Sequence, residues 1–364
     1  MKFYFPRFLF LIFFLISFSQ PVFANGKTET KFTLEHFSYA GPMAVLQLAN
    51  DWHGDLKKQN DAVSFIQGEF SFAHKGFQIG IVRRMYHQFE IDNDLARGFY
   101  YYNNKIELDQ RMQINANMTS RVYSGSGLRI GYEFDDSFGA FFEHLKITPS
   151  IVALRLDDII WGGFDGDLYY SSTDDWGGTI DLNYGYTKDH IARRKLPGDY
   201  LGWLYGLDLG IDWQSPWLDL KYEGINVLSR IYWDGMPRTT AQISTETAFY
   251  LLGHEYFEDV ILNAPALHYL EAAAPFSIFS SATSNFNSIY WFSSAQVTPI
   301  KSFYYHGLQI RTAEIKLGIQ YDFDSNTSKI SLEHANAVME FASQTLDVSR
   351  SQQIVMKLGL RYLF

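Results

Sequence analysis

The chain has 364 residues, with 30 Lys and Arg against 40 Asp and Glu, no cysteine, and 17% aromatic residues. The lack of cysteine excludes a disulfide scaffold, a thiolate metal site and a cysteine nucleophile. A net charge of -10 argues against a nucleic-acid partner, which needs a basic face.

The first 24 residues have the pattern of a secretory signal peptide. Lys2 and Arg7 give a positive start, residues 8–18 form an apolar core, and Val22 and Ala24 are small residues at the positions that a signal peptidase reads. The apolar run is short for a membrane span, which needs about 20 residues. We therefore expect cleavage after Ala24 and a single mature domain over residues 25–364.

Short segments of the mature chain alternate strictly between apolar and polar residues, which predicts β-strands with one apolar face. The clearest example runs from Trp203 to Trp213, and the alternation resumes after the turn at residues 214–217. The same pattern occurs at residues 66–72, 77–81, 128–134, 180–186, 218–222 and 315–323. The sequence therefore predicts an all-β, antiparallel protein.

Alternation fits both a soluble β fold and a transmembrane barrel, whose faces are inverted. Two features favour the barrel. The polar face mixes Gly, Ser and Asn with charged residues, as a lumen would. Trp203 and Trp213 end an apolar stripe, as the aromatic girdles at the membrane interfaces do.

One segment, residues 246–275, has a helical pattern instead. Phe249, Leu252, Tyr256 and Val260 follow a spacing of three to four residues. Pro265 could begin a second short helix that Pro275 would end. The segment predicts a helical loop or plug in the lumen, with packing on a barrel rim as the alternative.

The last strand carries the strongest motif. Ile354, Met356, Leu358, Leu360 and Tyr362 share a face, and the chain stops at Phe364. This strand resembles the C-terminal signal strand of Gram-negative outer-membrane β-barrels, with Lys357, Gly359, Tyr362 and Phe364 in the motif positions. The resemblance implies reading by the barrel-assembly machinery, closure against the first strand, a location in the cell outer membrane, and contact with its lipids and lipopolysaccharide.

A spanning strand needs about 9–11 residues, so the chain length favours a barrel of twelve to fourteen strands. If the C-terminus is periplasmic, one strand over residues 329–341 places the turn at 324–328 in the periplasm and the 342–351 loop outside. Long polar connections are expected at residues 40–61, 90–104, 188–201 and 233–246.

No catalytic constellation is complete in the sequence, so we expect no enzyme, no cofactor and no metal. His334-Ala335-Asn336 invites comparison with the His-x-Ser-Asn-Gly of outer-membrane phospholipase A, but Ala335 stands at the serine position. His254 and Glu258 lie one helical turn apart, and no third ligand accompanies them.

Inward-facing acids form a predicted cluster on adjacent strands, which is either a cation-favouring wall or an ion-pair network with Lys221, Arg129 or Arg155. The lumen-facing candidates are Asp181, Asp208, Asp212, Asp219, Lys221 and Glu223. On this basis Asp208→Asn should be tolerated.

The polar lumen face makes a channel or porin-like transporter for small polar solutes the leading function. A surface-exposed structural or adhesion barrel is the alternative, and an outer-membrane lipid-modifying enzyme ranks third. The sequence leaves the oligomeric state open.

Overall fold

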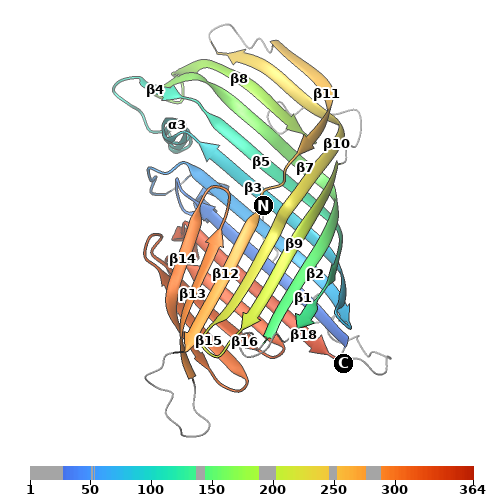
Figure 1. Cartoon of the computed structure of the whole chain (residues 1–364). Coiled ribbons are helices and arrows are strands. Elements are labelled where there is room, and N and C mark those ends of the chain that lie inside the picture. The colour runs from blue at the N-terminus through green and yellow to red at the C-terminus, as the bar shows by residue number, and fades with distance from the viewer. Residues whose placement is uncertain are drawn as a thin grey trace.

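The computed structural model describes residues 28–50, 52, 54–136, 144–187, 202–245, 252–275 and 288–364. Within them, fourteen antiparallel strands close into one barrel (Figure 1). The predicted all-β barrel of twelve to fourteen strands is therefore confirmed. The predicted signal peptide, residues 1–24, lies outside the described residues.

Each strand of the wall pairs with the next wall strand along the chain, and the last pairs with the first. The wall strands are β1 (Thr28–Ala40), β2 (Asp61–His74), β3 (Phe77–Ile91), β5 (Met118–Tyr132), β7 (His144–Tyr170), β9 (Gly202–Gln214), β10 (Asp219–Ser244), β12 (Leu267–Pro275), β13 (Ser288–Val297), β14 (Ser302–Arg311), β15 (Ile315–Asp322), β16 (Thr327–His334), β17 (Ala337–Ser343) and β18 (Gln353–Leu363).

The barrel closes between β1 and β18. Their register runs from Glu29 opposite Leu363 to Tyr39 opposite Gln353. The Phe364 amide donates to the Thr28 carbonyl at 2.9 Å, so both ends of the barrel domain lie at one rim, here called the C-terminal rim. The short turns at residues 75–76 and 215–218 lie at this rim, as periplasmic turns of such barrels do.

Phe364→Ser, or deletion of Phe364, should lower the amount of protein in the outer membrane severalfold. Phe364 completes the terminal motif, and its ring packs edge-on against Tyr362 with centroids 4.4 Å apart. Heat-modifiable protein in outer-membrane fractions measures the effect, and Phe364→Tyr, which keeps the ring, is the matched control. Normal amounts of the serine variant would contradict the motif assignment.

The wall rises on one side well beyond the rim opposite Phe364. β7 has 27 residues and β10 has 26, and both continue past the barrel as a curved sheet, here called the extension (Figure 1). The predicted loop at 233–246 is wrong, because β10 runs through it to Ser244. The additional strands are β4 (Met112–Asn115), β6 (Phe134–Asp136), β8 (Trp176–Tyr186) and β11 (Leu252–Leu262), all paired with β7 or β10.

Helices occur only in connections between strands in the described part of the chain. They are α2 (Val45–Asn50), α3 (Asn93–Asn104) and the 3-10 turn η3 (Val348–Arg350). Asp92 caps α3 by accepting a hydrogen bond from the Asp94 amide at 2.9 Å. None of these helices has the length and apolarity needed to span a membrane.

The predicted helical plug over 246–275 is wrong where the structure describes it. Residues 252–262 form β11 and residues 267–275 form β12, which pairs with both β10 and β13. A spacing of four residues from Leu252 to Tyr256 to Val260 also keeps one face of a strand. The spacing alone is therefore compatible with a helix or a strand, and pairing with β10 makes this segment a strand.

The single strand expected over 329–341 is also wrong. β16 ends at His334 and β17 begins at Ala337, so a tight turn at residues 335–336 separates two short strands. Because two strands replace one, every strand before this turn runs in the direction opposite to the predicted one. The connection between β15 and β16 therefore lies at the rim opposite Phe364, and not at the periplasmic side.

Apolar side chains form an exposed belt on the outside of the wall. Ile81, Ile151 and Ile319 are 64%, 66% and 61% exposed. Trp203, Tyr205 and Tyr232 gather where the belt meets the extension, with the Tyr205 and Tyr232 rings 5.9 Å apart. A closed wall with an apolar outer belt and an aromatic border is the architecture of outer-membrane β-barrels, in agreement with the resemblance of the last strand.

Candidate functional site

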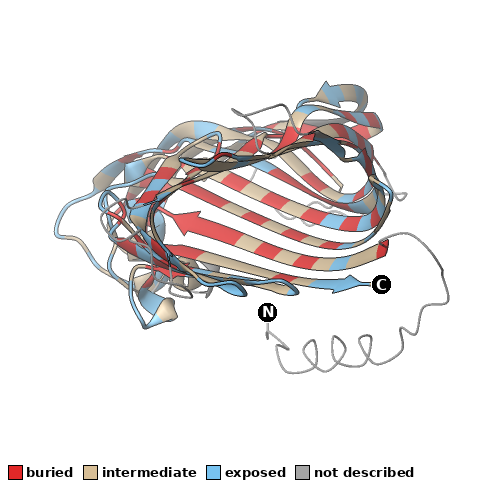
Figure 2. Ribbon diagram, turned by 60° about the horizontal axis from the view of Figure 1, so that its bottom comes forward, coloured by how far each residue is buried: buried red, intermediate tan, exposed pale blue. Residues whose placement is uncertain are grey.

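The half of the lumen farther from the C-terminal rim is filled by large side chains from strands around the wall, and Figure 2 shows buried residues along the inner surface. Phe37 of β1 meets Phe303 of β14 edge-on at 5.3 Å, and Tyr86 stacks on Tyr123 at 5.6 Å. Trp233 of β10 is 1% exposed. This apolar layer reaches across the barrel and occludes it.

A polar cluster centred on Arg84 lies on the periplasmic side of that layer. β3 turns Arg83 outward and Arg84 inward, because consecutive residues of a strand face opposite ways. Arg84 is fully buried, and its Nε donates to Gln67 Oε1 at 2.6 Å. Its Nη1 donates to Asp208 Oδ1 at 3.3 Å, and its Nη2 forms an ion pair with the same carboxylate.

Two arginines and two carboxylates balance the charge of the cluster. Arg129 Nε lies 3.4 Å from Asp208 Oδ2, and Arg129 Nη1 donates to Glu69 Oε1 at 3.2 Å. Asp208 thus contacts both guanidinium groups. Because a buried ion is costly unless it is paired and hydrogen-bonded, each charge in this cluster depends on the others.

Asn226 joins the cluster to β10 at an irregularity in the sheet. The register between β9 and β10 shifts between Gly224 and Leu228, and Asn226 takes a left-handed conformation there, with φ of 54°. Its amide donates to Asp208 Oδ1 at 2.9 Å, and its side chain donates to Tyr123 Oη at 2.8 Å. The cluster therefore ties β2, β3, β5, β9 and β10 together across the lumen.

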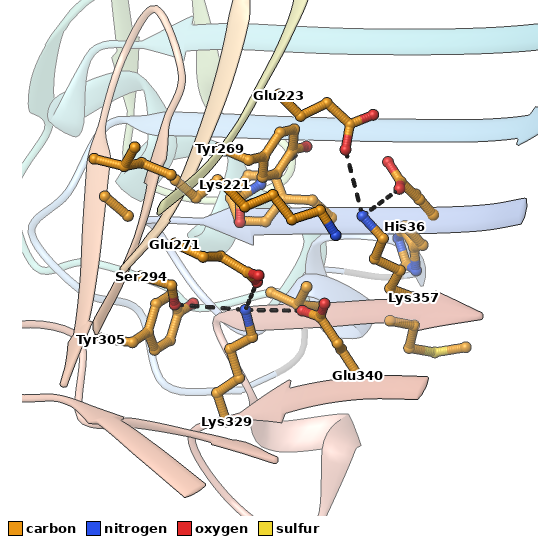
Figure 3. Close-up of a pocket in the computed structure, with 17 residues that line it drawn as sticks. His36, Lys221, Glu223, Tyr269, Glu271, Ser294, Tyr305, Lys329, Glu340 and Lys357 are labelled. Atoms are coloured by element: carbon orange, nitrogen blue, oxygen red, sulfur yellow. Dashed lines mark hydrogen bonds and ion pairs between the residues drawn. The ribbon is translucent and has the colours of Figure 1, made fainter. Parts of the chain in front are cut away.

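A charged chamber lies near the β1–β18 closure, with a cavity of about 50 Å³ (Figure 3). Lys357 Nζ lies 2.7 Å from Glu35 and 3.5 Å from Glu223. Lys329 Nζ lies 2.8 Å from Glu340 and 3.8 Å from Glu271. Lys221 also lines this chamber. A volume of this size holds one or a few water molecules.

A second cavity, of about 80 Å³, lies toward the C-terminal rim. Asp212, Asp219 and Lys221 line it together with Arg311 and Lys316. Arg311 forms an ion pair with Asp219, and its guanidinium lies 3.9 Å from the centre of the Tyr290 ring. Lys221 lines both cavities, so the charged surface continues from the chamber to the rim.

The structure brings five of the six predicted lumen residues to the inner surface, at different levels. Asp208 lies in the central cluster, Glu223 and Lys221 in the chamber, and Asp212 and Asp219 at the rim. Asp208, Asp219 and Glu223 each have a basic partner, so their contacts are those of an ion-pair network.

Asp181 does not join the cluster. It lies on β8 in the extension, where Gln242 donates to it at 2.9 Å. Gln242 stands 19 residues beyond Glu223 on β10, or roughly 60 Å along a strand that advances about 3.3 Å per residue. Of the predicted basic partners, Arg129 takes part, whereas alternation directs Arg155 away from the lumen.

Sequence reasoning missed Arg84 and Asn226, which hold the cluster together, and Lys329 and Glu340, which pair in the chamber. Arg84 left a usable signal, because Arg83 and Arg84 are consecutive in an apolar strand and one of them must face inward. Asn226 left none, since its role comes from a bulge that only the pairing of β9 with β10 creates. His334 ends β16 at a turn, and in the described ranges no three His, Asp or Glu side chains are placed to hold a metal.

Comparison with known proteins gives no family model and no curated protein that matches this chain. Solved structures with a similar course of the chain include the translocator domain of the autotransporter NalP from Neisseria meningitidis, at 10% identity, covering 99% of this chain and 96% of that one, with a TM-score of 0.31. The outer membrane protease OmpT from Escherichia coli has 9% identity, 96% and 100% coverage and a TM-score of 0.24. The monoaromatic hydrocarbon channel TodX has 9% identity, 94% and 90% coverage and a TM-score of 0.29. The chain's own closed wall and apolar outer belt are those of an outer-membrane β-barrel.

Proposed function

We propose that the barrel is a gated conduit for small polar solutes and that the structure describes its closed state. The observation that carries the proposal is the nature of the occlusion. It consists of side chains of the wall itself, namely the apolar layer and, on its periplasmic side, the cluster of Arg84 and Asp208. A charged, water-sized chamber continues from them toward the C-terminal rim. Rearranging side chains and the bulge at Asn226 could open such a seal without the removal of a domain.

The number of strands supports the proposal. The diameter of a barrel grows with strand number, and about eight strands already enclose an interior that side chains can fill. Fourteen strands enclose more cross-section than a purely structural barrel needs. Charged groups line much of the inner surface near the periplasmic side, although buried charges are costly. A hydrated path for polar solutes would explain why these charged groups line the inner surface.

The test is the conductance of purified, refolded protein in planar bilayers. The wild type should conduct weakly, and Arg84→Ala/Asp208→Ala should raise the conductance severalfold, because this pair supports the apolar layer from its periplasmic side through Asn226 and Tyr123. Removing both partners together leaves no unpaired charge at the two positions. The matched control is Arg83→Ala/Asp157→Ala, which removes an outward-facing ion pair of 3.0 Å between the neighbour of Arg84 on β3 and Asp157 of β7. Heat-modifiable migration checks that each variant is folded.

The extension favours a second candidate, a surface barrel that works through its exposed sheet. The sheet is tied at its far end, where Arg111 donates to both oxygens of Asp175 at 2.7 and 3.0 Å. These hydrogen bonds hold the pKa of the Asp175 carboxyl below its usual range. If the wild type and the Arg84/Asp208 variant both insert into bilayers and remain electrically silent, the conduit proposal fails and the surface barrel replaces it.

A further inference from the structure

Two serines and a histidine form a hydrogen-bonded chain on β1 and β2. His36 Nε2 lies 2.6 Å from Ser38 Oγ, and Ser38 Oγ lies 2.7 Å from Ser64 Oγ. A second imidazole, that of His87 on β3, stands opposite Ser64 in the register. A hydroxyl within hydrogen-bond reach of an imidazole is the basic arrangement of nucleophilic catalysis, and neither the fold nor the proposed conduit uses it.

The side chains of this group point away from the lumen. Phe37, between His36 and Ser38, packs on Phe303 inside the barrel. Alternation along β1 therefore turns His36 and Ser38 outward, although the backbone of β1 at this point borders the chamber in Figure 3. Ser64 lies opposite Ser38 and shares its face. The group thus belongs to the outer surface of the wall.

Its depth places it near the outer edge of the membrane. Eight residues separate Thr28, at the C-terminal rim, from His36. At about 3.3 Å per residue and a tilt of about 40°, His36 lies roughly 20 Å above that rim, and Ser38 and Ser64 lie farther out. The apolar band of such barrels is about 25 Å tall. The hydroxyl groups therefore stand at the level where acyl chains join lipid headgroups.

We propose that His36, Ser38 and Ser64 form an acyl-transfer site for ester-linked acyl chains of outer-leaflet lipids. Ser64 is partly exposed and Ser38 is 3% exposed, so Ser64 is the hydroxyl that reaches a lipid. Ser64 Oγ attacks the ester carbonyl, its proton passes to Ser38 Oγ, and the Ser38 proton passes to His36 Nε2. The alkoxide leaves with the proton from His36, and water then releases the fatty acid from Ser64 by the same route.

The experiment uses the purified full-length protein in detergent. A fluorophosphonate probe reports an activated serine, and fatty acid released from vesicles of phosphatidylethanolamine and phosphatidylglycerol reports turnover. The variants are Ser64→Ala, Ser38→Ala and His36→Asn. The matched control is Ser126→Ala on β5, an outward serine that accepts a hydrogen bond from Arg83 at 2.9 Å and has no part in the chain.

The wild type should take the label on Ser64 and release fatty acid. Ser64→Ala should abolish both, and Ser38→Ala and His36→Asn should slow both by about 10²-fold or more, the usual contribution of a general base. Ser126→Ala should match the wild type. Heat-modifiable migration shows which variants are folded. A wild type that takes no label and releases no fatty acid, or label that persists in folded Ser64→Ala, overturns the proposal, and neither result bears on conductance.

Discussion

Arg84→Ala should destabilise the barrel by about 3–5 kcal/mol, the cost of breaking a buried ion pair by removing one partner. The substitution leaves Asp208, 2% exposed, with only Arg129 as a cationic partner. It also removes the donors that Gln67 and the Asn226 side chain accept from. Urea unfolding of the refolded protein, followed by tryptophan fluorescence, measures the loss.

The neighbouring residue provides the control. Arg83→Ala removes an ion pair whose two side chains are each 49% exposed, and such pairs contribute about 0–1 kcal/mol. Equal losses for Arg83→Ala and Arg84→Ala would mean that the central cluster does not stabilise the barrel. The structure also changes the expectation for Asp208→Asn, which should now destabilise the barrel. A neutral side chain at this position leaves the buried Arg84 without its counter-charge.

Ile81→Arg should destabilise the barrel by about 2–4 kcal/mol in lipid, because a guanidinium on the lipid face near the middle of the membrane loses its hydration. Ile81 is 64% exposed within the apolar belt, so the cost comes from lipid and not from disrupted packing. Unfolding of protein refolded into lipid vesicles measures it.

Leu346 is the control for that substitution. It is fully exposed in the connection before η3, at the rim opposite Phe364, so Leu346→Arg should leave stability unchanged. If Ile81→Arg is as stable as the wild type in lipid vesicles, the belt does not face lipid.

The outer surface of this barrel could be predicted from sequence because the rule that shapes it is local. Every second side chain of a spanning strand faces lipid and must be apolar. This alternation can be recognised within a single strand, such as residues 203–213 or 354–362. The same alternation gave the inward direction of Asp208, Asp212 and Glu223. The chain length gave the strand number within its range.

The interior could not be predicted in the same way, because its contacts join distant parts of the chain. Arg84 meets Asp208 and Asn226 across more than 120 residues of sequence, at a bulge that appears only when β9 and β10 pair. The helical assignment of β11 failed for a related reason, since a spacing of four residues fits a helix face and a strand face alike.

The hydrogen-bonded chain of His36, Ser38 and Ser64 on the outer wall has a partial signal in the sequence. His36 and Ser38 are two residues apart in an alternating segment, which in a strand places both on one face. His334 lies at the end of β16, where it has no strand neighbour of that kind. Ser64 could not be added from sequence, because its position depends on the register of β1 with β2.

The closure of the wall has a kinetic consequence. All other neighbouring wall strands are consecutive wall strands along the chain, but Glu29 must find Leu363, which lies more than 330 residues away. Loop closure over that length costs about 5 kcal/mol of chain entropy, far more than a hairpin does. The pairing of β1 with β18 therefore has the highest entropic cost and should form last. Until it forms, β1 and β18 each expose a row of unpaired backbone amides and carbonyls, and such groups are very unfavourable in the hydrocarbon of the membrane. Folding and entry into the bilayer should accordingly be one coupled process, governed by the slow meeting of the two ends of the chain.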